Sequence, residues 1–138
     1  MFRLSIVTPE QVFFEGEINS LIVPGTEGYI GILANHAPLI SALKPGRVEF
    51  RDLEEKINVI SVTKGFLEVS GNVATILCDA AEFAQEIDIA RAQKSYDEAE
   101  ERIVMAGRLD KDTEIDVEAE KEALERASNR IRIFKEQK

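Results

Sequence analysis

Three glycines at three-residue spacing, Gly25, Gly28 and Gly31, form the first pattern in the chain that could do chemistry. Glycine-rich loops hold phosphate groups when a Lys-Ser or Lys-Thr pair follows and a helix begins there, because the first helical amides then point at the phosphate. Here the run leads instead into apolar residues and His36, with no helix beginning after it. We therefore predict a tight chain reversal between two strands, and a structural hydrogen bond rather than catalysis for His36.

Two pairs of charged residues lie near the ends of two helical patterns. Asp88 and Arg91 are three residues apart and share a face, so Asp88 can cap a helix and Arg91 can form a surface ion pair. Arg126 and Arg130 are four residues apart and can point together, as cations favoured near a helix C-terminus. Residue type and spacing alone thus give all four an ordinary structural explanation.

The chain shows neither a catalytic group nor a metal cluster in its pattern. Its one cysteine and one histidine lie far apart, which is not the spacing of a zinc site. We expect Cys78 to be a small buried residue on a strand, and a single cysteine cannot form an intrachain disulfide. The many carboxylates are interleaved with Lys and Arg, as on solvated helix faces. We therefore predict no enzyme activity, no catalytic residue and no metal.

The composition limits the partners. The chain has 138 residues, of which 44% are apolar, enough for one packed domain or a small domain with a helical appendage. The formal net charge is −9, which argues against nucleic acid and against bare anionic lipid. No run approaches the roughly 18–20 apolar residues that cross a bilayer, and no leader pattern opens the sequence. We expect membrane association only through a partner.

The elements that must position these residues fall into two classes. Up to about residue 84, short β-branched runs are bounded by Gly, Pro, Asn or Asp at hairpin spacing, which predicts antiparallel strands. The predicted strands cover residues 2–7, 18–23, 57–62, 66–69 and 73–77, with a hairpin turn at 70–72. Strands without intervening helices predict a sandwich or a flattened barrel.

After residue 82 the apolar period changes to alternating steps of three and four, which predicts two helices with narrow apolar seams. The seam residues are Ile89, Ala92, Tyr96, Ala99, Ile103 and Ala106 in the first helix, and Val117, Leu124, Ala127, Ile131 and Phe134 in the second, where Glu120 interrupts the stripe. Gly107 is expected to end the first helix and Asp112 or Thr113 to cap the second. Because the seams are rich in alanine they bury little area, which leaves open whether the hairpin is mobile or static.

Several segments together resemble the epsilon subunits of bacterial F-type ATP synthases along essentially the whole chain. They are Val7-Thr8-Pro9 and residues 25–39, 43–46, 65–69, 87–92 and 123–127, in the order and spacing of that family. Lys64 departs from the pattern, since the family usually has a second glycine before Gly65. The resemblance implies an α+β protein: an antiparallel β-sandwich of about ten strands over residues 1–84, followed by a two-helix antiparallel hairpin over residues 85–138.

The resemblance also implies a function as a rotor subunit of the central stalk. In that family the sandwich binds the gamma subunit and the membrane-embedded c-ring, which couples proton flow to ATP synthesis, and the loop from Glu27 to Gly31 would face the c-ring. The helices either fold against the sandwich or extend toward the alpha and beta subunits of the catalytic head and inhibit ATP hydrolysis. Such a subunit is peripheral, held through the complex at the cytoplasmic side of the inner cell membrane.

Some members of the family bind ATP as a regulatory ligand between the folded helices. The motif that supplies part of this site is matched by residues 87–92, which include Asp88 and Arg91. By the same resemblance Glu82 and the pair Arg126 and Arg130 complete it. Arginines suit phosphate because the guanidinium group donates in a fork, and carboxylates can accept from the adenine amino group or the ribose. Glu98 stands where the family usually has a basic residue, and this should weaken phosphate binding.

Two function classes compete with this interpretation. One is a free-standing nucleotide sensor whose helices close on the ligand. The other is a scaffold in which a sandwich with a mobile helical hairpin binds some other partner. The run from Gly25 to Leu39, taken with the later motifs, favours the rotor subunit over both.

Overall fold

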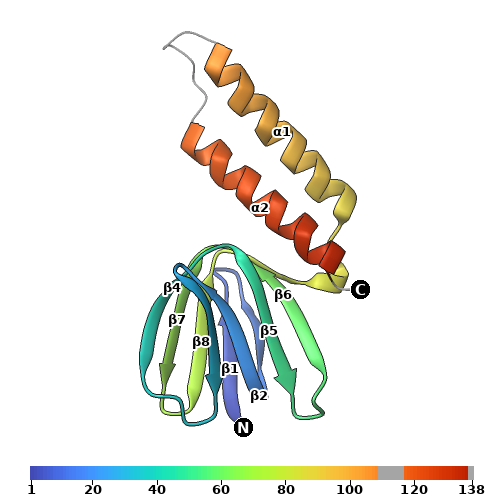
Figure 1. Cartoon of the computed structure of the whole chain (residues 1–138). Helices are drawn as coiled ribbons and strands as arrows, with labels where there is room; N and C mark the ends of the chain where they lie inside the picture. Colours follow the sequence, from blue (N-terminus) through green and yellow to red (C-terminus); the bar gives the residue numbers. More distant parts are fainter. Residues whose placement is uncertain (109–116, 137–138) are drawn as a thin grey trace. The chain divides into compact units, whose positions relative to one another are not determined.

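The computed structural model describes residues 1–108 and 117–136. Its contacts divide the chain into two compact units, Met1–Ala84 and Gln85–Lys138. The first unit is a β-sandwich and the second contains two helices (Figure 1). The strands are β1 (Phe2–Val7), β2 (Val12–Gly25), β3 (Gly28–Leu33), β4 (Leu39–Leu43), β5 (Gly46–Asp52), β6 (Ile57–Val62), β7 (Gly65–Ser70), β8 (Val73–Cys78) and β9 (Ala81–Phe83).

Alternating burial explains why these segments are strands. In β1 the side chains of Phe2, Leu4 and Ile6 are buried and those between them are not, so one face of the strand lies on the core. The β7–β8 connection is the two-residue turn predicted from the sequence. Gly71 and Asn72 both have a positive φ, at 56° and 61°, as the tight hairpin turn that matches strand twist requires.

The long strand β2 organises the sandwich. It runs for 14 residues and pairs with β1 through its first part and with β3, β4 and β5 through its second, with a register shift between Ile18 and Ser20. A strand that changes partners at such an irregularity can pair with strands in both layers of a sandwich. In all, the described part of the chain has nine strands, compared with the expected number of about ten.

One pairing differs from the fully antiparallel sandwich that the sequence predicted. The strand order is β1-β8-β7-β4-β2-β5-β6-β9, with β3 on β2 and a further β1–β2 pairing. Within it β1 and β8 are parallel, while the other pairings are antiparallel. These two strands lie at opposite ends of the unit in sequence, so no hairpin fixes their relative direction.

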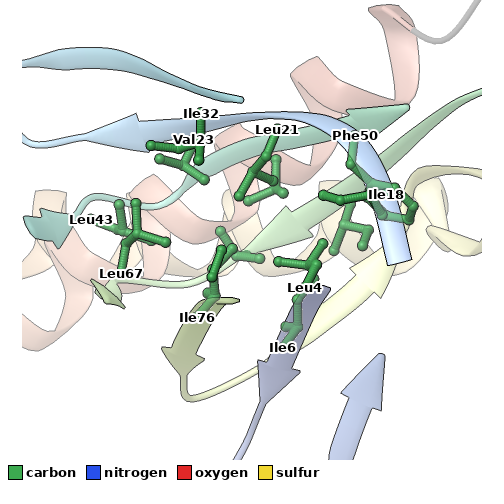
Figure 2. Close-up of a cluster of buried hydrophobic side chains, with 14 of the residues drawn as sticks. Leu4, Ile6, Ile18, Leu21, Val23, Ile32, Leu43, Phe50, Leu67 and Ile76 are labelled. Carbon is green, nitrogen blue, oxygen red and sulfur yellow. The ribbon is translucent and has the colours of Figure 1, made fainter. Parts of the chain in front are cut away.

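The core lies between the strands of the first unit. Figure 2 shows the side chains of Leu4, Ile6 and Ile76 on one side of this core and those of Leu21 and Phe50 on the other. Cys78 belongs to this core, as predicted, and burial raises the pKa of its thiol to about 11. The thiol is therefore un-ionised near neutral pH.

The second unit contains α1 (Ile89–Arg108) and α2 (Val117–Glu136), preceded by a short 3₁₀ turn over Ala84–Glu86. The helices pack side by side in opposite directions, and the Arg102 guanidinium lies 3.4 Å from a carboxylate oxygen of Glu120 across the pair (Figure 1). Helix α1 continues one residue past Gly107, and the predicted caps Asp112 and Thr113 lie outside the described residues.

Three alanines of the predicted seam are buried in the described part of the helices. Ala92, Ala99 and Ala127 are at most 2% exposed. In the last turns of α2, however, the prediction was incomplete. Its seam named Ile131, which is partly exposed, and left out Ile133, which is fully buried, as is the side chain of Asn129 one turn earlier. Both buried residues lie outside the single apolar stripe that the sequence predicted for this helix.

Candidate functional site

The start of α1 is built by Asp88. A carboxylate oxygen of Asp88 accepts a hydrogen bond from the backbone amide of Arg91 at 3.1 Å, and its carbonyl accepts from the amide of Ala92 at 3.0 Å. This is the geometry of an N-cap, so the predicted capping role is confirmed. The predicted ion pair is wrong, because Arg91 meets Asp88 through its backbone. Among the residues that the structure describes, no carboxylate pairs with the exposed guanidinium of Arg91.

The two predicted arginines of α2 lie one turn apart. Arg126 is exposed and has no partner within the described part of the chain, whereas Arg130 is partly buried and makes other interactions. Because α1 and α2 run in opposite directions, the last turns of α2 lie beside the first turns of α1. Positions 91, 126 and 130 therefore belong to the same end of the hairpin.

Helical spacing also places these arginines on one face of the hairpin. A groove on the other face is lined by residues of both helices, including Gln93 of α1 and Arg132 of α2. Two residues apart on a helix means about 200° of rotation, so Arg91 projects away from Gln93 and Arg130 away from Arg132. We name the face carrying Asp88, Arg91, Arg126 and Arg130 the arginine face. It presents three guanidinium groups, the donors best suited to phosphate.

Two acidic residues bear on the membership and the charge of this site. Glu82 lies on β9 opposite Ser61 and belongs to the unit Met1–Ala84, so the arginine face consists of the other four predicted residues. Glu98 lies two turns along α1 from Arg91, on the same flank, and its carboxylate is 3.9 Å from the ammonium of Lys94. Lys94 therefore offsets part of the negative charge that Glu98 brings.

The glycine run forms the predicted reversal. Gly25 and Gly28 are register partners in the β2–β3 hairpin, and Gly28 has a φ of 133°. A side chain at Gly25 would lie 2.7 Å from the Gly28 carbonyl oxygen. Gly31 differs, since a methyl group there would meet nothing within 4 Å. The ring nitrogen Nδ1 of His36 donates to the carbonyl oxygen of Ala37 at 2.7 Å, which confirms its structural role.

The outer face of the sheet carries a feature that the sequence prediction missed. Val7 pairs with Leu77, Leu77 with Phe66, and Phe66 with Ala42, so one row crosses four adjacent strands. Phe66 and Leu77 are 58% and 51% exposed, and the row lines a groove of about 690 Å³. We name these four residues the apolar row. The signal was present in β7, where the alternation places Phe66 on the outward side of the strand together with Glu68, opposite the buried Leu67.

Near this groove, Lys64 departs from the family's glycine without strain. It is not among the residues with a positive φ, whereas a side chain at Gly65 would approach the Leu77 carbonyl oxygen within bonding distance. The second glycine is therefore dispensable in this turn and Gly65 is not. Over the residues that the structure describes, neither helix is long and apolar enough to cross a membrane.

Family models account for both units. Residues 1–84 match the β-sandwich domain of the ATP synthase delta/epsilon chain, and residues 85–135 match its long α-helix domain. A sandwich followed by a helical hairpin is thus the class of the ATP synthase delta/epsilon chains. Relatives that match nearly the whole chain narrow this class further. The ATP synthase epsilon chain of Desulforamulus reducens is 42% identical over 94% of each chain, and that of Lacticaseibacillus casei is 37% identical over 96% of this chain and 93% of the relative.

The chain belongs to the family of ATP synthase epsilon chains, which are non-catalytic subunits. Solved structures agree on the fold. A chain of the Euglena gracilis mitochondrial ATP synthase is similar with a TM-score of 0.75 at 23% identity, over 91% of this chain and 76% of that one. A chain from the central stalk and c-ring of the Tetrahymena thermophila mitochondrial ATP synthase gives a TM-score of 0.59 at 16% identity, over 96% and 92%.

Proposed function

We propose that this chain is a rotor subunit of the central stalk of an F-type ATP synthase, in which its sandwich joins the gamma subunit to the c-ring and couples proton flow to ATP synthesis. The observation that carries the proposal is the apolar row, because large exposed side chains gathered on one sheet face are typical of a partner surface. We assign this face to the gamma subunit.

The β2–β3 hairpin supplies a second contact surface, which we assign to the c-ring. Tyr29 and Leu33 are 58% and 65% exposed beside the turn, and the glycine between them has no steric reason within this chain. A strand glycine with open space above it allows the backbone of another chain to approach closely. On this proposal the assembled complex holds the chain at the cytoplasmic side of the cell membrane.

A charge placed in the apolar row tests the gamma contact. We expect Phe66→Glu to abolish capture of the gamma subunit by this chain, since a carboxylate would have to be buried without a partner. Ile57→Glu is the matched control, because Ile57 is exposed to a similar extent on β6, outside the row. Equal capture by wild type and Phe66→Glu would contradict the assignment.

The helical hairpin is proposed to restrain ATP hydrolysis when it extends into the catalytic head. From its middle to its end, α2 carries Arg126, Arg130, Arg132 and Lys135, which would meet acidic surfaces of the alpha and beta subunits. Deletion of residues 88–138 should then raise hydrolysis by the assembled enzyme. Hydrolysis unchanged by the deletion would remove inhibition from the proposal and leave coupling intact.

ATP is proposed to bind the arginine face and to favour the paired helices over the extended form by differential affinity. The guanidinium groups of Arg91 and Arg126, which have no partner among the described residues, support this, and Glu98 is expected to lower the affinity. Calorimetric titration of the isolated protein with ATP tests it. Arg91→Ala and Arg126→Ala should each weaken binding, and Lys121→Ala should not. No heat at millimolar ATP would refute the site.

The two other function classes have less support. Family members are named as chains of a multisubunit synthase, which disfavours a free-standing sensor or an unrelated scaffold. A stable monomer that binds nucleotide but fails to capture a gamma subunit would favour the sensor.

A further inference from the structure

The hairpin carries a groove on the face opposite the arginine face, and we propose that it is a second ligand site, for a nucleoside diphosphate. The groove has a volume of about 430 Å³. It is lined by Gln93 and Tyr96 of α1 and by Ser128, Ile131, Arg132 and Lys135 of α2. This volume falls within the range of small-molecule sites, and the lining combines two cations, a ring and two neutral polar groups.

The two cations suit a diphosphate. Arg132 and Lys135 are three residues apart on α2 and so lie on the same side, roughly 5–6 Å apart at their Cβ atoms. They form an anion-binding pair on a chain whose net charge is −9. Lys135 has no ion-pair partner in the described part of the chain, so its ammonium is available to a phosphate.

Arg132 is held in place by a buried amide. A guanidinium nitrogen of Arg132 donates to the side-chain oxygen of Asn129 at 2.8 Å, and Asn129 is only 5% exposed. This hydrogen bond within one turn of α2 limits the conformations of the arginine side chain before any ligand arrives. The remaining guanidinium donors can then take two phosphate oxygens in a fork.

The opposite wall of the groove suits a base and a sugar. Tyr96 is half-buried, and its hydroxyl has no partner among the described residues. Its ring, with Ile131 across the groove, offers a surface on which a planar base can stack. Gln93 donates to a carboxylate oxygen of Asp97 at 3.0 Å, which orients the amide at the groove edge. Asp97 also places a negative charge at that edge, so the phosphates must sit at the Arg132 end.

Both helices contribute to the groove, so binding of a ligand there affects the pairing of the helices. It contacts the complete lining only while α1 and α2 are paired, so binding must stabilise the paired hairpin. The site does not depend on the arginine face, because the two sets of side chains project from opposite flanks of the helices.

Titration with ADP in a background that lacks the arginine face tests the site. In the full-length Arg91→Ala/Arg126→Ala variant, ADP should shift the amide resonances of Gln93, Tyr96, Ser128 and Ile131. Adding Arg132→Ala should weaken this binding by roughly tenfold or more, because it removes charge-assisted hydrogen bonds. Adding Lys121→Ala, which removes an exposed cation of α2 outside the groove, should change it less than twofold.

Four outcomes would overturn the proposal. They are no shifts at millimolar ADP, equal weakening by Arg132→Ala and Lys121→Ala, binding of inorganic pyrophosphate as tightly as ADP, and tighter binding of an acidic peptide. Tyr96→Ala separates the two halves of the ligand, since it should weaken ADP and leave pyrophosphate unaffected. The double-alanine background makes all these readouts independent of whether the arginine face binds ATP.

Discussion

At the scale of the residue, the described glycines include some that the fold requires and one, Gly31, that it does not. A side chain at Gly65 would collide with the backbone of β8 at Leu77, and one at Gly46 would lie 2.6 Å from Pro24. Gly31 sits in the middle of β3 with open space above it. Whether the fold requires a glycine at a given position thus depends on the atoms around it, and the residue type alone does not show this.

We expect Gly65→Ala to lower the free energy of unfolding by about 2 kcal/mol or more, because β7 and β8 must separate to admit the methyl group. Gly31→Ala should leave stability unchanged or raise it by roughly 0.5 kcal/mol through the unfolded chain. Urea unfolding of both variants measures the difference. The same loss in both would show that strand propensity, rather than the collision, sets the requirement.

A second prediction at this scale concerns Asp52, at the end of β5. Its carboxylate accepts hydrogen bonds from the amides of Lys56 and Glu54, each at 3.0 Å, and from Asn58 at 3.3 Å. The bond from the Lys56 amide is the main cause that lowers the pKa of Asp52 below its ordinary value of 3.8. Stability from this group is therefore present above pH 3.8 and lost as the pH falls through the folded-state pKa.

Asp52→Asn should accordingly flatten the pH dependence of unfolding below pH 3.8, since the amide does not titrate. Urea midpoints of wild type and variant, measured from neutral pH into the acid range, compare the two. A variant that keeps the full acid dependence would place the responsible carboxylate elsewhere.

At the scale of the element, the helical hairpin depends on small side chains. Ala92 and Ala99 of α1 and Ala127 of α2 are buried where the helices meet, and small residues let helix axes approach closely. Such a seam buries little apolar area per turn, so the pairing is sensitive to added volume.

We expect Ala99→Leu to destabilise the pairing of α1 and α2 by about 1–3 kcal/mol, because the seam has no room for three further carbon atoms. Hydrogen exchange of the α2 amides should accelerate in this variant and stay slow in the sandwich. Glu100→Leu, at the next and exposed position, is the control. Equal acceleration in both variants would point to helix propensity rather than packing.

Sequence patterns predicted the strands, turns and helix ends well wherever a local preference, such as a single buried face, determines the pattern. The alternation in β1, the turn at Gly71 and Asn72 and the cap at Asp88 were all recoverable, because each is a local preference. The extent of β2 was not recoverable, since its first half holds a glycine and two glutamates that mimic a loop, yet this half pairs with β1 from Val12 to Ile18 with one irregularity.

The candidate site was predictable in part for the same reason. Helical spacing groups Arg91 with Arg126 and Arg130 only once the direction of the second helix is known. The opposite groove was missed because Tyr96 and Ile131 were expected to be seam residues, whereas they line its open side. The parallel pairing of β1 with β8 depends on contacts between distant segments, which no local pattern encodes.

At the scale of the whole molecule, the two units differ in how they are stabilised. All members of the hydrophobic core cluster lie between Phe2 and Phe83, inside the unit Met1–Ala84. The second unit relies on the alanine seam and on ion pairs such as that of Arg102 with Glu120, which are worth little at a surface.

We therefore expect a fragment of residues 1–84 to fold alone, with the amide chemical shifts of its core strands as in the full chain. A fragment of residues 85–138 should be only partly helical, because short helices with little buried surface are marginal in water. Circular dichroism and heteronuclear NMR of both fragments measure this. A disordered first fragment would show that the helices complete its core.

The connectivity of β2 has a mechanical consequence. Since this strand is bonded to β1, β3, β4 and β5, a pull along its axis loads many hydrogen bonds in shear at once instead of opening them one after another. A hairpin at a sheet edge would peel under the same load. In the proposed rotor role, such a strand would join the two sides of the sandwich rigidly, and lengthening it by a flexible insertion at Asn19 would make the domain yield at a lower force.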